Sequence, residues 1–381
     1  MNFETKCVHA QKDISAACDK TGAISFPIYQ SSTFAHPGPG QSTGYDYTRM
    51  QNPTREQLEN VVAGLENGDE CIAFSSGMAA ISAVMELFKP GDHVIIDEDL
   101  YGGTIRLFQH VNEKNGITFT RVNFSEEDIR PHIGENTRAV FFETPTNPMM
   151  NVADIEKISA IAHEHGLLCI VDNTFLSPYL QNPLALGADL VIHSGTKYLG
   201  GHNDTIAGFV VTKTPDLTEK LRFLIKTTGA ALAPFDSWLI LRGIKTLAIR
   251  IDRMQENTAK IVDWLTKQKA VTRVYYPGLS DHPGHEIMKK QSRGFGSMVT
   301  FEVESKEKAI QILNDVDLIL YAESLAGTET LITYPLTQTH ADVPPEFLEK
   351  NGITDRVLRL SVGIEAAEDL IAELDRVINS N

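Results

Sequence analysis

The sequence has few basic side chains and no long apolar run, and both deficits exclude classes of protein. Its 381 residues include 34 Lys and Arg against 50 Asp and Glu, a formal net charge of −16. Proteins that bind nucleic acid or anionic membrane surfaces usually present a basic face, so we expect neither partner. No apolar stretch approaches the roughly 20 residues that span a bilayer. The first residues, Met1-Asn2-Phe3-Glu4, lack the apolar core of a signal peptide, so we expect a cytoplasmic protein.

Cysteine is also scarce, and the cysteines that are present form no pattern. Cys7, Cys18, Cys71 and Cys169 are widely separated in the chain. Zinc sites show paired cysteine spacings, and disulfide frameworks occur mainly in small secreted proteins. The sequence therefore predicts reduced thiols and no metal site.

The composition that remains is that of a folded globular protein. Hydrophobic residues make up 42% and charged residues 22% of the chain, which is enough to bury a large core. At about 150 residues per domain, the length suggests two domains. Residues 1–52 are rich in Ser, Thr, Gly and Pro and have little apolar surface. We expect them to form an arm that is ordered only against another part of the protein or another subunit.

Residues 53–235 alternate between short apolar runs and amphipathic ones. Pro53-Thr54 followed by Gln57 predicts the capped start of a helix. Strands are expected at 71–74, 94–96, 139–142, 167–171 and 190–192, with helices at 78–88, 104–111 and 155–163. Strands that alternate with helices form parallel sheets covered on both faces. The predicted fold class is therefore α/β, with a mainly parallel central sheet.

Residues 236–381 have a different pattern, which predicts a smaller α+β domain. A helical period runs from Trp238 to Leu265 and is weakly interrupted at Gly243. Strands are expected at 271–276, 298–303, 318–320 and 358–362, and helices at 306–313 and 367–378.

Ligands of open parallel sheets bind beyond the carboxyl ends of the strands, so the residues found there are the candidates for function. The first expected strand is followed by Ser75-Ser76-Gly77-Met78, which opens a helix whose free amides could bind an anion. Taken alone, this segment fits a tight strand-to-helix turn better than an anion site. The Gly-Lys-Ser/Thr phosphate loop and the Gly-x-Gly-x-x-Gly dinucleotide motif are absent.

Two further strands are followed by charged residues at the same expected edge. Asp172 directly follows the strand 167–171. A carboxylate buried at this place is costly unless it meets a cation or several hydrogen-bond donors. An aspartate that caps a loop would also account for it. Lys197 follows the strand 190–192, on a loop with glycine and two hydroxyls. Most lysines are solvated surface charges, but this one is expected beside Asp172 and Gly77.

Together these loops supply the groups that pyridoxal phosphate requires. The cofactor needs a phosphate site, an acid for its protonated ring nitrogen and an amine that forms a Schiff base with its aldehyde. Tyr101, which follows another expected strand, could stack on the ring. The expected groups are Gly77, Met78, Ser194 and Thr196 for the phosphate, Asp172 for the ring nitrogen and Lys197 for the aldehyde.

These residues lie in motifs that resemble a known family, the pyridoxal-phosphate-dependent cystathionine γ-synthases, γ-lyases and β-lyases of cysteine and methionine metabolism. The resemblance runs from about Thr21 to the end of the chain. Its motifs are Tyr45-Asp46-Tyr47-Thr48-Arg49 with Asn52-Pro53-Thr54, Ser75-Ser76-Gly77-Met78-Ala79, Tyr101-Gly102-Gly103-Thr104, Glu143-Thr144-Pro145-Thr146-Asn147-Pro148, Val171-Asp172-Asn173-Thr174, Thr196-Lys197-Tyr198 and Arg359-Leu360-Ser361-Val362-Gly363. It implies the aspartate-aminotransferase-like fold (fold type I), sulfur amino acid substrates and a homotetramer that shares its active sites.

The resemblance also implies roles for individual positions. Lys197 would bind the cofactor and move protons, Asp172 would meet the ring nitrogen, and Tyr101 would stack on the ring and help to deprotonate the substrate amine. Tyr47 and Arg49 would reach into the site of the neighbouring subunit. The substrate carboxylate would be held by Asn147, Ser324 and Arg359.

Three positions depart from the family's commonest pattern. Gly195 stands where Ala or Cys is usual, Asn203 where Ser is usual, and Ala326 where Gly is usual. None of these changes affects the cofactor assignment, but each could alter the substrate pocket.

The reaction is less clear from the sequence than the cofactor. Methionine γ-lyases of the family carry Cys at the position of Gly103, which argues against that activity. Glu323 stands where γ-synthases and γ-lyases have Glu and some β-lyases have Tyr, and an acid there could meet the distal ammonium of cystathionine. Residues 41–45 and 332–342 most resemble γ-synthases that use acylated homoserine. We therefore rank γ-synthase first, then γ-lyase and β-lyase.

Proteins of other classes remain as alternatives. A non-catalytic protein on the same fold would be expected to lose the lysine or the aspartate, and both are present. A nicotinamide oxidoreductase would need the dinucleotide glycine motif, which is absent.

Overall fold

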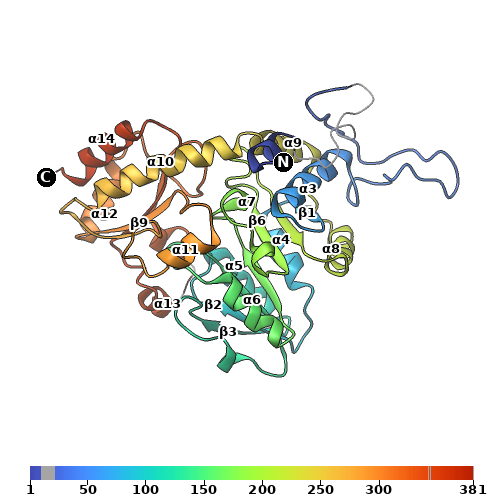
Figure 1. Ribbon diagram of the computed structural model, residues 1–381, viewed down its shortest axis with the longest axis horizontal. Coiled ribbons are helices and arrows are strands. Elements are labelled where there is room, and N and C mark those ends of the chain that lie inside the picture. Colours follow the sequence, from blue (N-terminus) through green and yellow to red (C-terminus); the bar gives the residue numbers. More distant parts are fainter. Residues whose placement is uncertain (10–21, 342, 344, 381) are drawn as a thin grey trace.

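The computed structural model describes residues 1–9, 22–341, 343 and 345–380, and two β-sheets form the framework of this part of the chain (Figure 1). The larger sheet contains seven strands of the described chain. In their order across the sheet these are β1 (Cys71–Phe74), β7 (Gly208–Thr212), β6 (Leu190–Ser194), β5 (Leu168–Asp172), β4 (Thr137–Glu143), β2 (His93–Asp97) and β3 (Thr118–Val122). Only β7 runs antiparallel to its neighbours, so the predicted mainly parallel α/β sheet is confirmed.

Helices cover both faces of the larger sheet, because alternate residues of its strands enter two different cores. In β1, for example, Cys71 and Ala73 pack into one core, whereas Ile72 and Phe74 pack into the other. The first core also contains side chains of α3 (Pro53–Glu66) and α6 (Ile155–Glu164). The second contains those of α4 (Gly77–Met85), α5 (Gly102–Leu107) and α8 (Pro215–Thr228). Shorter helical segments are η1 (Phe108–Asn112), η2 (Arg130–His132), α7 (Ser177–Leu180) and η3 (Pro183–Leu186).

The smaller sheet is mainly antiparallel and has its own core. Its strands, in order, are β10 (Leu320–Tyr321), β11 (Leu331–Thr333), β12 (Val357–Ser361), β9 (Met298–Val303) and β8 (Val271–Tyr275). The helices of this part are α11 (His285–Gln291), α12 (Lys306–Asp315), η4 (Pro335–Thr337), α13 (Pro345–Lys350) and α14 (Ala367–Ile378). Apolar residues of α12, α14 and the second half of α10 (Leu247–Leu265) pack against this sheet. A separate α+β unit was expected here, although its boundary at residue 235 stays a prediction.

Several local expectations were wrong. The helical run from Trp238 to Leu265 is two helices, α9 (Pro234–Ile244) and α10, and the break lies at Lys245 and Thr246 rather than at Gly243. The helix α3 is capped by Asn52, whose side chain accepts hydrogen bonds from the amides of Thr54 and Arg55, and not by Thr54. The strands β3 and β7 and the helix α8 were not expected at all.

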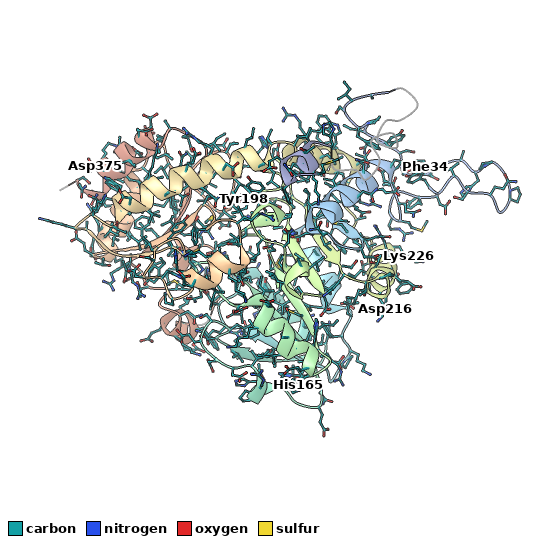
Figure 2. The ribbon with its side chains drawn as sticks, in the orientation of Figure 1. Phe34, His165, Tyr198, Asp216, Lys226 and Asp375 are labelled. Carbon is teal, nitrogen blue, oxygen red and sulfur yellow. The ribbon has the colours of Figure 1, made fainter. Side chains whose placement is uncertain are left out.

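The N-terminal part begins with a helix that packs on the body of the same chain. In α1 (Phe3–His9), Cys7 is buried and the Phe3 ring lies 5.4 Å from that of Tyr179. Part of the segment that follows residue 21 instead projects from the body, and Phe34 lies on this projecting part (Figures 1 and 2). An antiparallel bridge between Thr33 and Tyr47 folds this segment back on itself. Of the described residues of the predicted arm, those of α1 therefore pack on the body, whereas part of the segment after residue 21 projects from it.

Three other expectations concern features of the chain as a whole. Among the residues that the structure describes, no helix is long and apolar enough to cross a membrane. The same residues contain no group of three potential metal-binding side chains. Cys7, Cys71 and Cys169 are buried free thiols, and Cys18 lies outside the described residues.

Candidate active site

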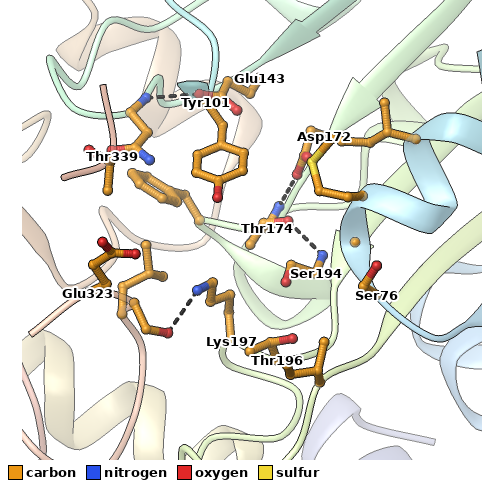
Figure 3. Close-up of a pocket in the computed structure, with 18 of the residues that line it drawn as sticks. Ser76, Tyr101, Glu143, Asp172, Thr174, Ser194, Thr196, Lys197, Glu323 and Thr339 are labelled. Atoms are coloured by element: carbon orange, nitrogen blue, oxygen red, sulfur yellow. Dashed lines mark hydrogen bonds between the residues drawn. The ribbon is translucent and has the colours of Figure 1, made fainter. Parts of the chain in front are cut away.

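A cavity of about 290 Å³ opens at the carboxyl ends of the strands of the larger sheet, where the smaller sheet's loops approach it. All of the predicted site residues except Tyr47 and Arg49 line this cavity: Gly77, Met78, Tyr101, Asn147, Asp172, Ser194, Thr196, Lys197, Glu323, Ser324 and Arg359. The structure thus brings together side chains from β5, β6 and β12 and from the loops that follow β2, β4 and β10 (Figure 3).

Lys197 projects its amine into the cavity from the loop after β6 (Figure 3). Its Nζ donates a hydrogen bond of 2.8 Å to Ser324 Oγ. Burial and, to a lesser extent, the Arg359 guanidinium lower the pKa of this amine to about 8, although Glu323 opposes the shift. Near physiological pH the neutral, nucleophilic form of this amine is therefore far more populated than in an ordinary lysine.

One end of the cavity is suited to an anion. The helix α4 begins here at Gly77, and the Ser76 side chain caps it by accepting a 3.1 Å hydrogen bond from Ala79 N. A Cβ on Gly77 would lie only 3.1 Å from Ser194 Cβ, so glycine lets β6 and the start of α4 come together. The first amides of α4 and the side chains of Ser194 and Thr196 therefore line the same cavity, and such groups are typical of a phosphate-binding site.

Asp172 lies at the end of β5, away from the lysine (Figure 3). Its Oδ1 accepts a 2.9 Å hydrogen bond from Thr174 N, and Thr174 Oγ1 in turn accepts one from Ser194 N. Burial raises the pKa of the Asp172 carboxyl, while the Thr174 bonds and the nearby His193 lower it. A carboxylate in such surroundings is stabilised by a cationic partner.

The Tyr101 ring lies over the cavity, and two glycines make its position possible. A Cβ on Gly103 would lie 2.4 Å from Tyr101 Cε1 and 3.2 Å from Met78 Sδ, so the ring occupies the space that a side chain would need. A Cβ on Gly102 would lie 2.1 Å from the carbonyl oxygen of Thr339. The start of α5 therefore packs by its backbone against the loop that carries Thr339.

Arg359 on β12 is almost fully buried and faces the cavity without a full set of partners. Its Nη1 donates to Asn147 Oδ1 at 2.8 Å, and its Nη2 donates to the Ser324 carbonyl oxygen at 2.9 Å. Its Nε is buried and has no partner among the described residues. Burial lowers the pKa of this guanidinium to about 10, and nearby Tyr101 and Glu323 favour its charge. Such a cation is suited to bind the carboxylate of an amino acid.

The residues present fit pyridoxal phosphate. An amine, an acid, an aromatic face and an anion site lie around one cavity, and the unpartnered Arg359 Nε leaves a donor for a carboxylate.

Comparison with known proteins agrees with this chemistry. Residues 4–379 match the family model of the Cys/Met metabolism PLP-dependent enzymes. This chain belongs to that family. It is 48% identical over 379 residues to the cystathionine beta-lyase of Lactococcus lactis subsp. cremoris, covering 99% of both chains. It is 50% identical over 359 residues to the cystathionine gamma-synthase/O-acetylhomoserine (thiol)-lyase of Bacillus subtilis, covering 94% of this chain and 92% of the relative.

A solved structure is similarly close. The cystathionine gamma-lyase from Lactobacillus plantarum, complexed with L-serine, superposes with a TM-score of 0.95 at 45% identity, covering 100% of this chain and 99% of the other. The chain is thus a PLP-dependent enzyme of fold type I that acts on carbon–sulfur bonds, and pyridoxal 5′-phosphate is its cofactor. The predicted family, fold and cofactor are confirmed.

This PLP enzyme also contains a buried polar network that the sequence did not reveal. His193 Nε2 lies 2.7 Å from Glu66 Oε1, and both side chains are almost fully buried. The same oxygen accepts a 3.0 Å bond from Asn173 Nδ2. The network joins α3 to the ends of β5 and β6, so it holds the strand ends that carry Asp172 and Ser194. Glu66 lies at the end of a helix and resembles a surface residue in sequence, so no local pattern could have revealed this role.

Other residues of the cavity had no predicted role. Apart from Thr174 and Glu143, which belong to recognised motifs, these include Ile81, Phe175, Ile206, Leu325 and Thr339. Ile206 is 62% exposed although it lines the cavity, so it lies at the mouth.

Tyr47 and Arg49 do not reach the cavity of their own chain. Tyr47 is 44% exposed, and the Arg49 guanidinium lies 5.5 Å from the centre of its ring. Arg49 also donates a hydrogen bond to the Lys226 carbonyl oxygen on α8. Both therefore lie on the outside of the described chain, where the projecting segment returns to the body.

The three departures from the family pattern have structural counterparts. A Cβ on Gly195 would lie 2.3 Å from Phe209 Cε2, so the phenyl ring on β7 excludes the usual larger residue. Asn203 and Ala326 both have positive φ, +54° and +65°. Asn203 tolerates this conformation and its Nδ2 donates a 2.8 Å bond to Glu329 Oε2, whereas Ala326 stands in a conformation that favours glycine.

Proposed function

We propose that this PLP enzyme acts on sulfur amino acids, and that its principal reaction is the γ-synthase reaction, in which the cysteine thiol replaces the acyloxy group at Cγ of an acylated homoserine, giving cystathionine and a free carboxylate. The observation that supports cystathionine chemistry in general is Glu323. This exposed carboxylate lines the cavity on the residue before Ser324, whose hydroxyl meets the Lys197 amine. A carboxylate there can form a charge-assisted bond with the distal ammonium of cystathionine or of incoming cysteine.

The other residues of the cavity would each have a separate role in binding or catalysis. Arg359, with Asn147 and Ser324, would hold the substrate carboxylate, and its unpartnered Nε supports that role. Lys197 would bind the cofactor's aldehyde and carry protons between substrate carbons, for which its lowered pKa is suited. Tyr101 would lie over the ring, Asp172 would keep the ring nitrogen protonated, and the cofactor would then store the electron pair released from the substrate. Gly77, Met78, Ser194 and Thr196 would hold the phosphate.

The cavity also argues against methionine γ-lyase activity. The family's methionine γ-lyases have Cys at the position of Gly103, where in this chain even a Cβ would meet the Tyr101 ring at 2.4 Å. A cysteine would require the ring to move. We therefore propose that the ring position seen here belongs to an enzyme of cystathionine chemistry.

The second candidate is cystathionine cleavage, as γ-lyase and then as β-lyase. Sequence similarity supports cystathionine cleavage as strongly as the γ-synthase reaction, because relatives of nearly equal identity are named beta-lyase, gamma-lyase and gamma-synthase. Glu323 would serve the distal ammonium in the lyase reactions as well, so the order of the candidates rests on segments 41–45 and 332–342. Of these, residue 342 lies outside the described residues.

We further propose that the active sites are shared between subunits of a homotetramer. The support is that Tyr47 and Arg49 lie outside their own cavity at the base of a segment that projects from the body. The proposed partners are small sulfur amino acids and copies of the same chain.

The proposal is tested by supplying alternative substrates to the purified enzyme. O-acetylhomoserine or O-succinylhomoserine is offered with cysteine, and cystathionine is offered alone. Cystathionine formation as the fastest reaction supports γ-synthase. Release of cysteine with 2-oxobutyrate identifies a γ-lyase, and release of homocysteine with pyruvate identifies a β-lyase. Borohydride trapping of the cofactor on a peptide other than that of Lys197 would contradict the assigned amine.

A further inference from the structure

Glu143 is a second buried carboxyl group beside Asp172. It is the last residue of β4, and in the parallel pairing of β4 with β5 it stands directly opposite Asp172. Its side chain is only 8% exposed and lines the same cavity (Figure 3). Two carboxyl groups at neighbouring strand ends would repel each other if both were ionised.

The two carboxyl groups differ in what stabilises a negative charge on them. Asp172 accepts a hydrogen bond from Thr174 N, and His193 lies close enough to favour its charge. Glu143 Oε1 accepts one bond, at 3.1 Å from Asn147 N. Among the described residues, no hydrogen bond reaches Glu143 Oε2. A single amide is weak compensation for an ionised carboxylate removed from water.

The charged groups around Glu143 also disfavour a negative charge on its side chain. The carboxyl groups of Asp172, Asp99 and Asp97 all disfavour its ionisation, and Arg359 is the cation that faces it. Arg359 directs its Nη1 to Asn147 Oδ1 rather than to Glu143. Burial and these three acids hold the pKa of Glu143 well above its usual range.

We propose that Glu143 is a neutral carboxylic acid, which presents an O–H donor to the cavity, and that Asp172 is the one of these two neighbours that carries a negative charge. Its Oε1 is the carbonyl oxygen that accepts from Asn147 N, which leaves Oε2 to hold the proton. In this state Glu143 positions Asn147, the partner of Arg359, and supplies the occupant of the cavity with one hydrogen bond. The role rests on the proposed function, because the occupant is taken to be the cofactor with its substrate.

Replacing Glu143 with glutamine, which has the same shape and a neutral donor, tests whether Glu143 acts as a protonated acid or as an ionised carboxylate. In Glu143→Gln, the amide keeps a carbonyl at Oε1 and places an N–H₂ donor at Oε2, so kcat/KM should fall by no more than about tenfold. Glu143→Ala removes both groups and should lower kcat/KM by about a hundredfold. If Gln is as damaging as Ala, Glu143 acts as a carboxylate and the proposal is wrong. If Ala is as active as the parent, no donor is needed at this position and the proposal is equally wrong.

The proton itself is measured by infrared spectroscopy, in both the holoenzyme and the apoenzyme. A protonated carboxyl group has a carbonyl stretching band that shifts in heavy water, and we expect Glu143→Gln to remove one such band at neutral pH. Glu323→Gln is the matched control, since it removes the exposed carboxylate of the same cavity and should leave that band in place. A band that persists in Glu143→Gln, or is absent from the parent, would overturn the proposal. Because the apoenzyme contains no cofactor, this outcome is independent of whether Lys197 is the cofactor's amine.

Discussion

Lys197 Nζ and Ser324 Oγ are joined by a hydrogen bond of 2.8 Å, although they stand 127 positions apart in the chain. Lys197 follows a strand of the larger sheet, and Ser324 precedes a strand of the smaller one. Ser324 makes this contact with a φ of +87°, a conformation that L-residues other than glycine rarely adopt. Backbone strain of this kind persists where the surrounding structure requires it, and it clusters at functional sites.

The strain at Ser324 predicts that two substitutions differ in their effect on stability and agree in their effect on activity. Ser324→Gly and Ser324→Ala both remove the hydroxyl, so both should raise KM for the amino acid substrate. Glycine adopts positive φ without penalty, so Ser324→Gly should be more stable than Ser324→Ala by about 1 kcal/mol. Urea unfolding midpoints of the two variants measure the difference. Equal midpoints would mean that the positive φ stores no strain.

The lowered pKa of Lys197 predicts how the apoenzyme takes up its cofactor. The neutral amine is the reactive form, so the rate of cofactor binding should rise with pH through about 8. Glu323 favours the protonated amine, and Glu323→Gln should therefore shift this profile to lower pH. Stopped-flow absorbance of cofactor addition across a pH series provides the measurement. Glu304→Gln, which removes an exposed acid outside the cavity, should leave the profile unchanged.

The contact between Gly195 and Phe209 predicts a pair of compensating substitutions. Gly195→Ala places a Cβ 2.3 Å from Phe209 Cε2 and 2.9 Å from Ala207 Cβ, an overpacking that should cost about 1–3 kcal/mol. Phe209→Leu shortens the opposing side chain, so the double variant should be less destabilised than the sum of the two single changes. Free energies of unfolding for the three variants test this coupling. If the two changes in the free energy of unfolding simply add in the double variant, the Phe209 ring does not limit the side chain at position 195.

The sequence predicted the strand ends of this site well because parallel strands are buried on both faces. Such strands appear as continuous apolar runs, and the polar residue that follows each run then marks the edge where ligands bind. Asp172 and Lys197 were identified in this way, and the structure brings both to one cavity. The family motifs added residues such as Asn147 and Arg359, which come from segments that no periodic pattern connects.

The features that were missed depend on contacts between distant segments. β3 is an edge strand whose side chains are mostly partly exposed, so its sequence lacks the apolar run of a central strand. The break between α9 and α10 contains neither glycine nor proline, and Gly243 instead lets α9 lie against the lysine loop, where a Cβ would be 2.2 Å from the Gly200 carbonyl oxygen. The buried pair of Glu66 and His193 joins residues 127 positions apart. None of these arrangements leaves a local signal.

Shared active sites predict that two inactive variants restore one another. Arg49 lies outside the cavity of its own chain, with its guanidinium near Tyr47 and bonded to the Lys226 carbonyl oxygen. If Arg49 completes the site of the neighbouring subunit, Arg49→Ala should weaken phosphate binding there, and Lys197→Ala should abolish turnover in its own site. In a hybrid dimer, one site then combines the intact Lys197 of one protomer with the intact Arg49 of the other.

The expected size of this restoration follows from random assembly. Half of the dimers formed from an equal mixture are hybrids with one intact site, so activity should return to about one quarter of the parent's value. The mixture is denatured and refolded together, and subunit exchange is verified by mass difference between tagged protomers. Each variant refolded alone is the control and should stay inactive. Verified hybrids without activity would assign Arg49 to its own subunit, where its bond to Lys226 would then be its whole role.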